Sequence, residues 1–137
     1  MAERILTENE VVDAVRAYLV QQGWEILSFA HGQNPGYDIH AAQGQRELMV
    51  EAKGAGSGTP GTQRYGKLFT QGQVITHVSR AVFVALERLN EGYESAIALP
   101  DNARHRAAIG RVSKPLAQLG ISVYYVTDNS SIRLHSR

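Results

Sequence analysis

Three charged residues in the first half of the chain, Asp38, Glu51 and Lys53, have the side-chain types that hydrolytic chemistry at a phosphate uses. Residues 47–53 read as a β-strand, in which side chains alternate between the two faces. Glu51 and Lys53 therefore point the same way, with Cα atoms roughly 7 Å apart. Asp38 lies on the preceding predicted strand, before a short turn at Gly44. We expect two carboxylates and a lysine to meet at one place.

Hydrolysis of a phosphodiester needs an attacking hydroxide, neutralisation of charge on the phosphoryl oxygens and help for the leaving oxygen. Mg²⁺ suits these tasks because it prefers oxygen ligands and keeps several bound waters, and Mn²⁺ could substitute for it. We expect Asp38 and Glu51 to be the metal ligands, together with the backbone carbonyl of Ala52. Lys53 would orient or activate the attacking water and offset developing negative charge. Asp38, Glu51 and Lys53 are therefore the predicted catalytic residues.

A structural salt bridge is the alternative interpretation of these residues. A glutamate and a lysine two positions apart are common on exposed strand faces, and an aspartate beside a turn could cap that turn. Leu48 and Val50, however, assign one face of the strand to the core, and Met49 indicates that the charged face is partly covered too. Charges on a half-buried face are costly unless they pair or bind a metal. The pattern therefore favours a functional site.

Hydrophobic periodicity and turn residues predict the elements that must position this site. Thr7 and Glu10 form a capping box at the start of a helix that Gly23 ends. The later elements are strands at 24–29, 37–42 and 47–53, a helix from about 70 to 90, a strand at 95–99, a helical region from 102 that breaks near 113, and a strand at 121–127. We predict one α/β domain over residues 1–137, with a mixed β-sheet flanked by helices in the order αβββαβαβ. The tail after Asp128 reads as a weak further strand.

A glycine-rich stretch at 54–66 follows the charged strand and contains five glycines and a proline. This composition predicts a flexible loop. The loop could lie as a flap on a phosphate backbone, although a solvated linker fits its composition equally well. Residues of the loop and of the start of the next helix are the predicted nucleic-acid contacts: Arg64, Tyr65, Lys67, Gln71, Gln73 and His77.

The run Gly36-Tyr37-Asp38, followed on the next strand by Glu51-Ala52-Lys53, resembles the motif of the PD-(D/E)XK nuclease superfamily. The chain looks most like the archaeal Holliday-junction resolvases and the Mrr-type nuclease domains. It departs from the pattern at Pro35, which lies three positions before Asp38 and not directly before it. The resemblance implies a restriction-endonuclease-like fold, Mg²⁺-dependent DNA cleavage and a further acidic ligand from the first helix, which Glu10 or Glu8 could supply.

Composition excludes several classes of protein. The chain has no cysteines, so disulfides and cysteine metal sites are ruled out. Its charged start, MAERILTENE, does not read as a signal peptide, and no apolar run is long enough to span a bilayer. We therefore expect a soluble, cytoplasmic protein. Residues 61–68 nearly match a P-loop, but Leu68 stands where the magnesium-binding Ser or Thr belongs, so an NTPase is excluded.

Two functions remain open from the sequence. The first is a metal-dependent endodeoxyribonuclease that acts on DNA as a homodimer, because one small site addresses one strand. The second is a non-catalytic nucleic-acid-binding or assembly module that keeps the same fold. Residues 1–53 carry eight acidic and four basic residues, whereas residues 54–137 carry five acidic and ten basic ones. In the second case the basic half would contact phosphates.

Overall fold

The computed structural model describes residues 5–31, 38–56 and 68–135. The helices in these ranges are α1 (Glu8–Gln21), α2 (Gln71–Asn90), α3 (Ala103–Gly110) and α4 (Ser113–Gln118). The strands are β1 (Glu25–Phe29), β2 (Ile39–Gln43), β3 (Arg46–Ala52), β4 (Glu94–Pro100), β5 (Ser122–Val126) and β6 (Ile132–Leu134). The helical region after residue 102 is divided into α3 and α4, and the tail forms β6.

The six strands form one sheet in sequence order, from β1 to β6. Strands β1, β2 and β3 are antiparallel neighbours, so the predicted hairpin of β2 and β3 is present. Strands β4 and β5 continue the sheet in parallel with β3, through connections that contain α2 and then α3 and α4. Strand β6 is the last strand of the sheet and pairs antiparallel with β5. The predicted α/β class with a mixed sheet is confirmed.

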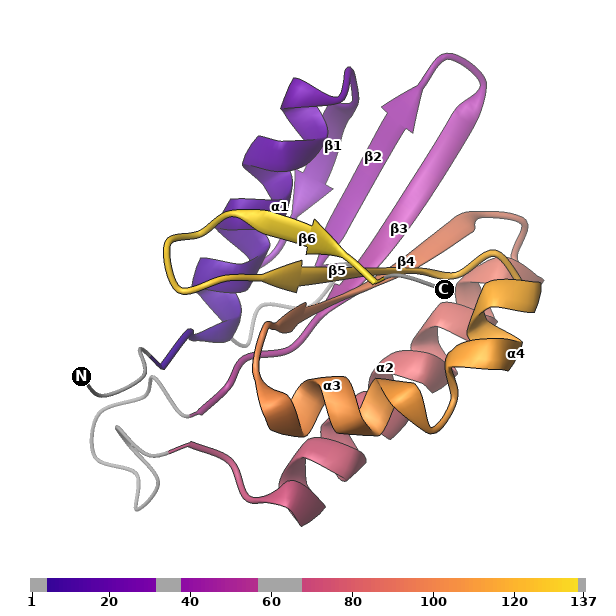
Figure 1. Cartoon of the computed structure of the whole chain (residues 1–137). Coiled ribbons are helices and arrows are strands. Elements are labelled where there is room, and N and C mark those ends of the chain that lie inside the picture. Colours follow the sequence, from indigo (N-terminus) through magenta and orange to yellow (C-terminus); the bar gives the residue numbers. More distant parts are fainter. Residues whose placement is uncertain (1–4, 32–37, 57–67, 136–137) are drawn as a thin grey trace.

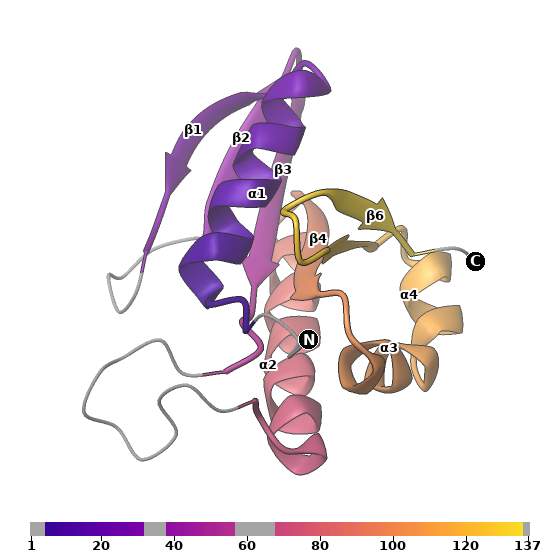
Figure 2. The same cartoon turned by 60° about the vertical axis from the view of Figure 1, so that its left-hand side comes forward.

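Side chains that alternate along the strands supply a core on each face of the sheet. Leu48, Val50 and Ala52 of β3 pack in the core that α1 covers. Ile97 and Leu99 of β4 pack in the other core, under α2, α3 and α4. Figures 1 and 2 show these three layers, with α1 alone on its side of the sheet.

Capping boxes define where the two long helices begin. Thr7 accepts a hydrogen bond from the backbone of Glu10 at the start of α1, and Thr70 accepts one from Gln73 at the start of α2. Each box satisfies backbone N–H groups that a helix start leaves unpaired. In the described parts of the chain, no helix combines the length and the apolar character needed to cross a membrane.

The first residues of the predicted flexible loop are packed parts of the fold. Gly54, Ala55 and Gly56 are buried. Ala55 N donates to Leu6 O at 2.7 Å, and Ala55 O accepts from Phe69 N at 2.9 Å. Composition predicts flexibility here, but these backbone contacts hold residues 54–56 in place. Residues 57–66, which form the rest of the predicted loop, lie outside the described residues.

Candidate active site

The end of β3 places Glu51 and Lys53 on the sheet face that α2 covers, beside Met49. Their side chains are 18% and 21% exposed, and Lys53 Nζ lies 3.9 Å from Glu51 Oε1. This distance is the limit of an ion pair, so the lysine is not held tightly by the glutamate. Lys53 N donates to Ala98 O at 3.0 Å, which anchors the end of the strand to β4. The two side chains share a face, as the strand pattern predicts.

Asp38 meets the end of β3 from the start of β2. Its Oδ2 accepts a hydrogen bond from Ala52 N at 2.8 Å, and its backbone carbonyl accepts one from Ala30 N at 3.1 Å. The aspartate is therefore fixed to two neighbouring strands. In an extended strand the N–H and C=O of one residue point to the same side. The Ala52 carbonyl, which the sequence predicts as a metal ligand, thus faces the side of the strand where Asp38 lies.

Glu51 is largely buried and lies near other acidic side chains. Burial raises its pKa to about 8, and a hydrogen bond with Asp38 and the negative charges of Asp38 and Glu8 act in the same direction. Lys53 opposes them. Without a bound cation, Glu51 therefore keeps its proton at neutral pH, because burial and the neighbouring carboxylates disfavour its ionised form. A cation bound between the carboxylates would compete with that proton, since metal ligands must be deprotonated.

The first helix brings Glu8 toward these charges. Burial raises the pKa of Glu8, Asp38 adds to this effect and Lys53 reduces it. Glu10 instead completes the capping box, where its Oε1 accepts from Thr7 N at 3.1 Å and from Thr7 Oγ1 at 3.2 Å. Of the two acids that the resemblance offers, Glu8 thus interacts electrostatically with Asp38 and Lys53.

Gly54 explains how α1 reaches the end of β3. A Cβ atom at this position would lie 2.6 Å from Glu8 N and 3.0 Å from the carbonyl carbon of Thr7. Only glycine permits so close a backbone approach. Sequence reasoning missed this contact, and it left Glu8 and Glu10 open as the acid from the first helix. The one sequence signal was a glycine directly after the Glu-Ala-Lys motif.

The donor chemistry of this site fits a hard cation. Asp38, Glu51 and the Ala52 carbonyl offer oxygen atoms only, and Mg²⁺ is commonly held by one or two carboxylates while it keeps several waters. A small cavity of about 20 Å³ borders Asp38, Glu51 and Arg88, which is room for about one water. Within the described ranges, no group of three His, Cys, Asp or Glu side chains is placed to hold a metal ion. The residues thus suit an open magnesium site and not a closed one.

The predicted nucleic-acid contacts on α2 have different surroundings. Gln73 Oε1 accepts from Thr70 N at 2.8 Å in the capping box, and Gln71 Nε2 donates to Arg104 O at 3.2 Å. His77 interacts electrostatically with the candidate site: burial, and then the charge of Lys53, lower its pKa. The other three predicted contacts, Arg64, Tyr65 and Lys67, lie outside the described residues.

Comparison with known proteins adds no assignment to this geometry. The chain matches no protein-family model, no curated protein and no solved structure. What the site can do must therefore be argued from its own residues.

Proposed function

We propose that this protein is a Mg²⁺-dependent nuclease of the PD-(D/E)XK type that hydrolyses phosphodiester bonds in DNA. One observation carries the proposal: Asp38 and Glu51 line one small cavity at a half-buried strand end, beside Lys53. Glu8 adds a further negative charge. Clustered acids destabilise a folded protein unless a cation or a proton offsets their charge, and strongly shifted pKa values are concentrated at functional sites.

Each residue has a role that follows from its position. Asp38, Glu51 and the Ala52 carbonyl would hold Mg²⁺, which when bound supplies a hydroxide at neutral pH and neutralises phosphoryl charge. The backbone N–H of Ala52 keeps the Asp38 carboxylate oriented. Lys53, only loosely paired with Glu51, is able to donate to the attacking water or to a phosphoryl oxygen.

Plasmid nicking tests this proposal. We expect the purified chain to cut supercoiled DNA with Mg²⁺ or Mn²⁺ and to lose this activity with a chelator. Lys53→Ala should lower the rate by roughly 10²–10⁴-fold, the usual contribution of a positioned proton-transfer group, with an unchanged circular dichroism spectrum. Lys114→Ala, which changes an exposed lysine on α4, is the matched control. Equal rates for the two variants would contradict the role of Lys53.

A non-catalytic nucleic-acid-binding module is the second candidate, and one observation favours it. The described residues contain no ready three-ligand metal group, so the acidic cluster could exist without a metal. Calorimetric titration with Mn²⁺ separates the two functions. Salt-sensitive DNA binding without Mn²⁺ binding, in the wild type and in Asp38→Asn alike, would favour the module.

The nuclease proposal includes a homodimer on DNA. One site of this size addresses one strand, and two-strand cleavage commonly uses two-fold symmetry. Sedimentation should therefore show a dimer, free or on a DNA duplex. A monomer under both conditions would count against this part of the proposal.

A further inference from the structure

Helix α2 carries exposed apolar side chains on the face opposite its buried residues. Phe83 is 65% exposed, more than any other large apolar side chain in the described parts of the chain, and Leu86 is 40% exposed. Val82 and Ile75 continue this surface as half-buried side chains. Since residues three and four positions apart lie on one side of a helix, these four side chains form one apolar strip along α2.

A groove of about 350 Å³ continues the strip toward α3. Its apolar walls include Ile75 and Val82 of α2 and Val112 after α3, and its polar lining consists of Ser79 and Arg111. The long side chain of Arg111 can lie along an apolar group that fills the groove and keep its guanidinium in water. The strip and the groove therefore form one apolar surface of the kind that marks a contact with another molecule.

Two exposed charges of opposite sign flank Phe83 on α2. Arg80 precedes it by three positions and Glu87 follows it by four. The two charges are about 10 Å apart along the helix axis, and within the described ranges neither takes part in an ion pair. In an antiparallel copy of α2 the order of the charges is reversed. Each Arg80 would then face Glu87 of the other copy, so the surface is complementary in charge to itself.

The candidate active site lies on another side of α2. Val84 and Arg88 line the small cavity at Asp38 and Glu51. Successive residues of a helix differ in direction by about 100°, so Val84 points well away from the direction of Phe83. A second molecule that covers the strip would therefore leave the candidate site open to DNA.

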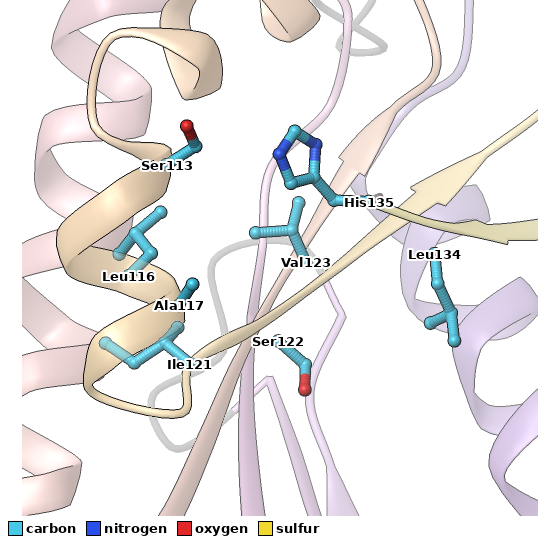
Figure 3. A pocket seen from close by; sticks show the side chains of 8 residues that line it. All are labelled: Ser113, Leu116, Ala117, Ile121, Ser122, Val123, Leu134 and His135. Atoms are coloured by element: carbon cyan, nitrogen blue, oxygen red, sulfur yellow. The ribbon is translucent and has the colours of Figure 1, made fainter. Parts of the chain in front are cut away.

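A second apolar hollow has no comparable charges. It measures about 170 Å³ and lies between α4 and strands β5 and β6, where Figure 3 shows Ser113 and His135 beside aliphatic side chains. Its described lining contains no acidic side chain, and His135 Nδ1 already lies 3.3 Å from the Tyr125 hydroxyl. An apolar hollow alone does not indicate which partner covers it. On α2, the charges beside the strip do.

We propose that the strip on α2 binds the same strip of a second copy of this chain, with the two helices antiparallel across a two-fold axis near Phe83. A two-fold interface must be self-complementary. Here apolar side chains meet apolar side chains, and Arg80 of each copy pairs with Glu87 of the other. This inference rests on the proposed function, because it names the surface that forms the homodimer. Each copy keeps its own site free to cut one strand.

Sedimentation equilibrium of the free protein tests the interface. We expect the wild type to form a dimer and Phe83→Glu to raise its dissociation constant by about 30-fold or more, the usual effect of losing a central contact residue. Val20→Glu is the matched control, because Val20 is 58% exposed on α1 and lies outside the strip. It should leave the dissociation constant unchanged. Equal dissociation constants for the two variants would overturn the proposal.

Exchange of the two charges tests the antiparallel arrangement and keeps the proposal falsifiable if Phe83→Glu fails to fold. Arg80→Glu places two acids beside the strip and Glu87→Arg places two bases, so each variant alone should dimerise about tenfold more weakly. An equimolar mixture of the two variants should recover the wild-type dissociation constant, because every acid then faces a base. The same dissociation constant for the wild type, both variants and their mixture would overturn the arrangement.

Plasmid cleavage by the same proteins separates this inference from the nuclease. A monomeric wild type that nicks DNA rejects the interface and leaves the nuclease. A dimer that Phe83→Glu dissociates, but that cuts nothing with Mg²⁺ or Mn²⁺, rejects the nuclease and leaves the interface. If both proposals hold, Phe83→Glu should still nick one strand and lose the linear product of two-strand cleavage. A monomeric wild type that cuts nothing rejects both.

Discussion

Two carboxylates with low exposure lie near the ends of neighbouring parallel strands, and their surroundings are opposite. Asp101 follows β4, its side chain is 11% exposed, and its Oδ1 binds Arg106 and also Arg133 at 3.2 Å. Glu51 is 18% exposed at the end of β3, lines a small cavity together with Asp38 and has Lys53 at 3.9 Å. One carboxylate is fully matched by positive charge, and the other is crowded by negative charge.

This difference separates a structural ion pair, at Asp101, from a candidate functional site, at Glu51. At Asp101, two arginines from different elements bind a single carboxylate. This is the arrangement expected of an ion pair that only stabilises the fold. At Glu51 the same sheet gathers carboxylates instead, and burial, followed by the interaction with Asp38, raises the pKa of Glu51. Unfavourable charge of this kind is expected where a cation or a substrate completes the group.

Glu51→Gln should have the largest effect and act on function alone. We expect Mg²⁺-dependent cleavage to fall by more than about 100-fold, since changes even outside the first ligand shell can cost that much. The metal-free protein should keep its stability at neutral pH, because the amide can still donate to Asp38. Plasmid nicking and urea unfolding measure the two quantities. A large loss of stability would place Glu51 with Asp101 as a structural group.

The pH dependence of the metal-free protein gives the control for this variant. The pKa of Glu51 is raised to about 8 in the folded state, so the folded protein holds a proton that the unfolded chain loses above its ordinary pKa near 4.5. Stability should therefore fall as pH rises from about 4.5 to about 8. Glu51→Gln should remove this slope, and an unchanged slope would contradict the assignment.

His105 on α3, the helix that follows Asp101, should make the stability of the folded protein depend on pH in the opposite direction. Burial, with a contribution from His77, lowers the pKa of His105 from 6.5 to about 4. The unfolded chain then binds a proton that the folded chain rejects between these values, so stability is lost as pH falls from about 6.5 toward 4. The loss is on the order of 3 kcal/mol. Urea unfolding across this range should show it in the wild type and not in His105→Phe.

Gly54→Ala should disturb the site through its supporting backbone. The added Cβ would lie 2.6 Å from Glu8 N, so α1 must move away from β3. We expect a loss of roughly 1–3 kcal/mol of stability, typical of overpacking, and weaker Mn²⁺ binding by calorimetry. Gly72→Ala is the matched control, because a Cβ there meets nothing within 4 Å. In the first turn of α2 it should stabilise the helix by about 0.5–1 kcal/mol. Equal Mn²⁺ affinities in the two variants would show that Gly54 does not position the site.

The parts of this site that the sequence predicts are those set by local pattern. Alternation along residues 47–53 puts Glu51 and Lys53 on one face, and the short turn at Gly44 brings Asp38 back beside them. The same local rules predict the mixed sheet and the starts of both long helices. Each of these features depends on residues that are close together in the chain.

The features that the sequence missed depend on contacts between distant residues. Gly54 meets Glu8 only because the end of β3 packs against the start of α1, and no periodicity reports that contact. The capping box correctly gives Glu10 a structural role, but it does not show that Glu8 interacts with Asp38 and Lys53. Glycine content predicts a flexible loop from residue 54, whereas hydrogen bonds to Leu6 and Phe69 fix Ala55. Asp101 likewise gains Arg133 only through the pairing of β5 with β6.

Asp101→Asn should have the smallest effect and act on stability alone. The variant weakens two charge-assisted hydrogen bonds. The side chains of Arg106 and Arg133 are 44% and 59% exposed, however, so water can hydrate them and compensate for much of the loss. We expect the free energy of unfolding to fall by about 1 kcal/mol, with plasmid cleavage unchanged. Arg133→Ala should cost less than Arg106→Ala, because the side chain of Arg133 is the more exposed. If Asp101→Asn instead abolished cleavage at unchanged stability, both carboxylates would belong to the site. The contrast between a paired and a crowded acid would then no longer separate structure from function in this sheet.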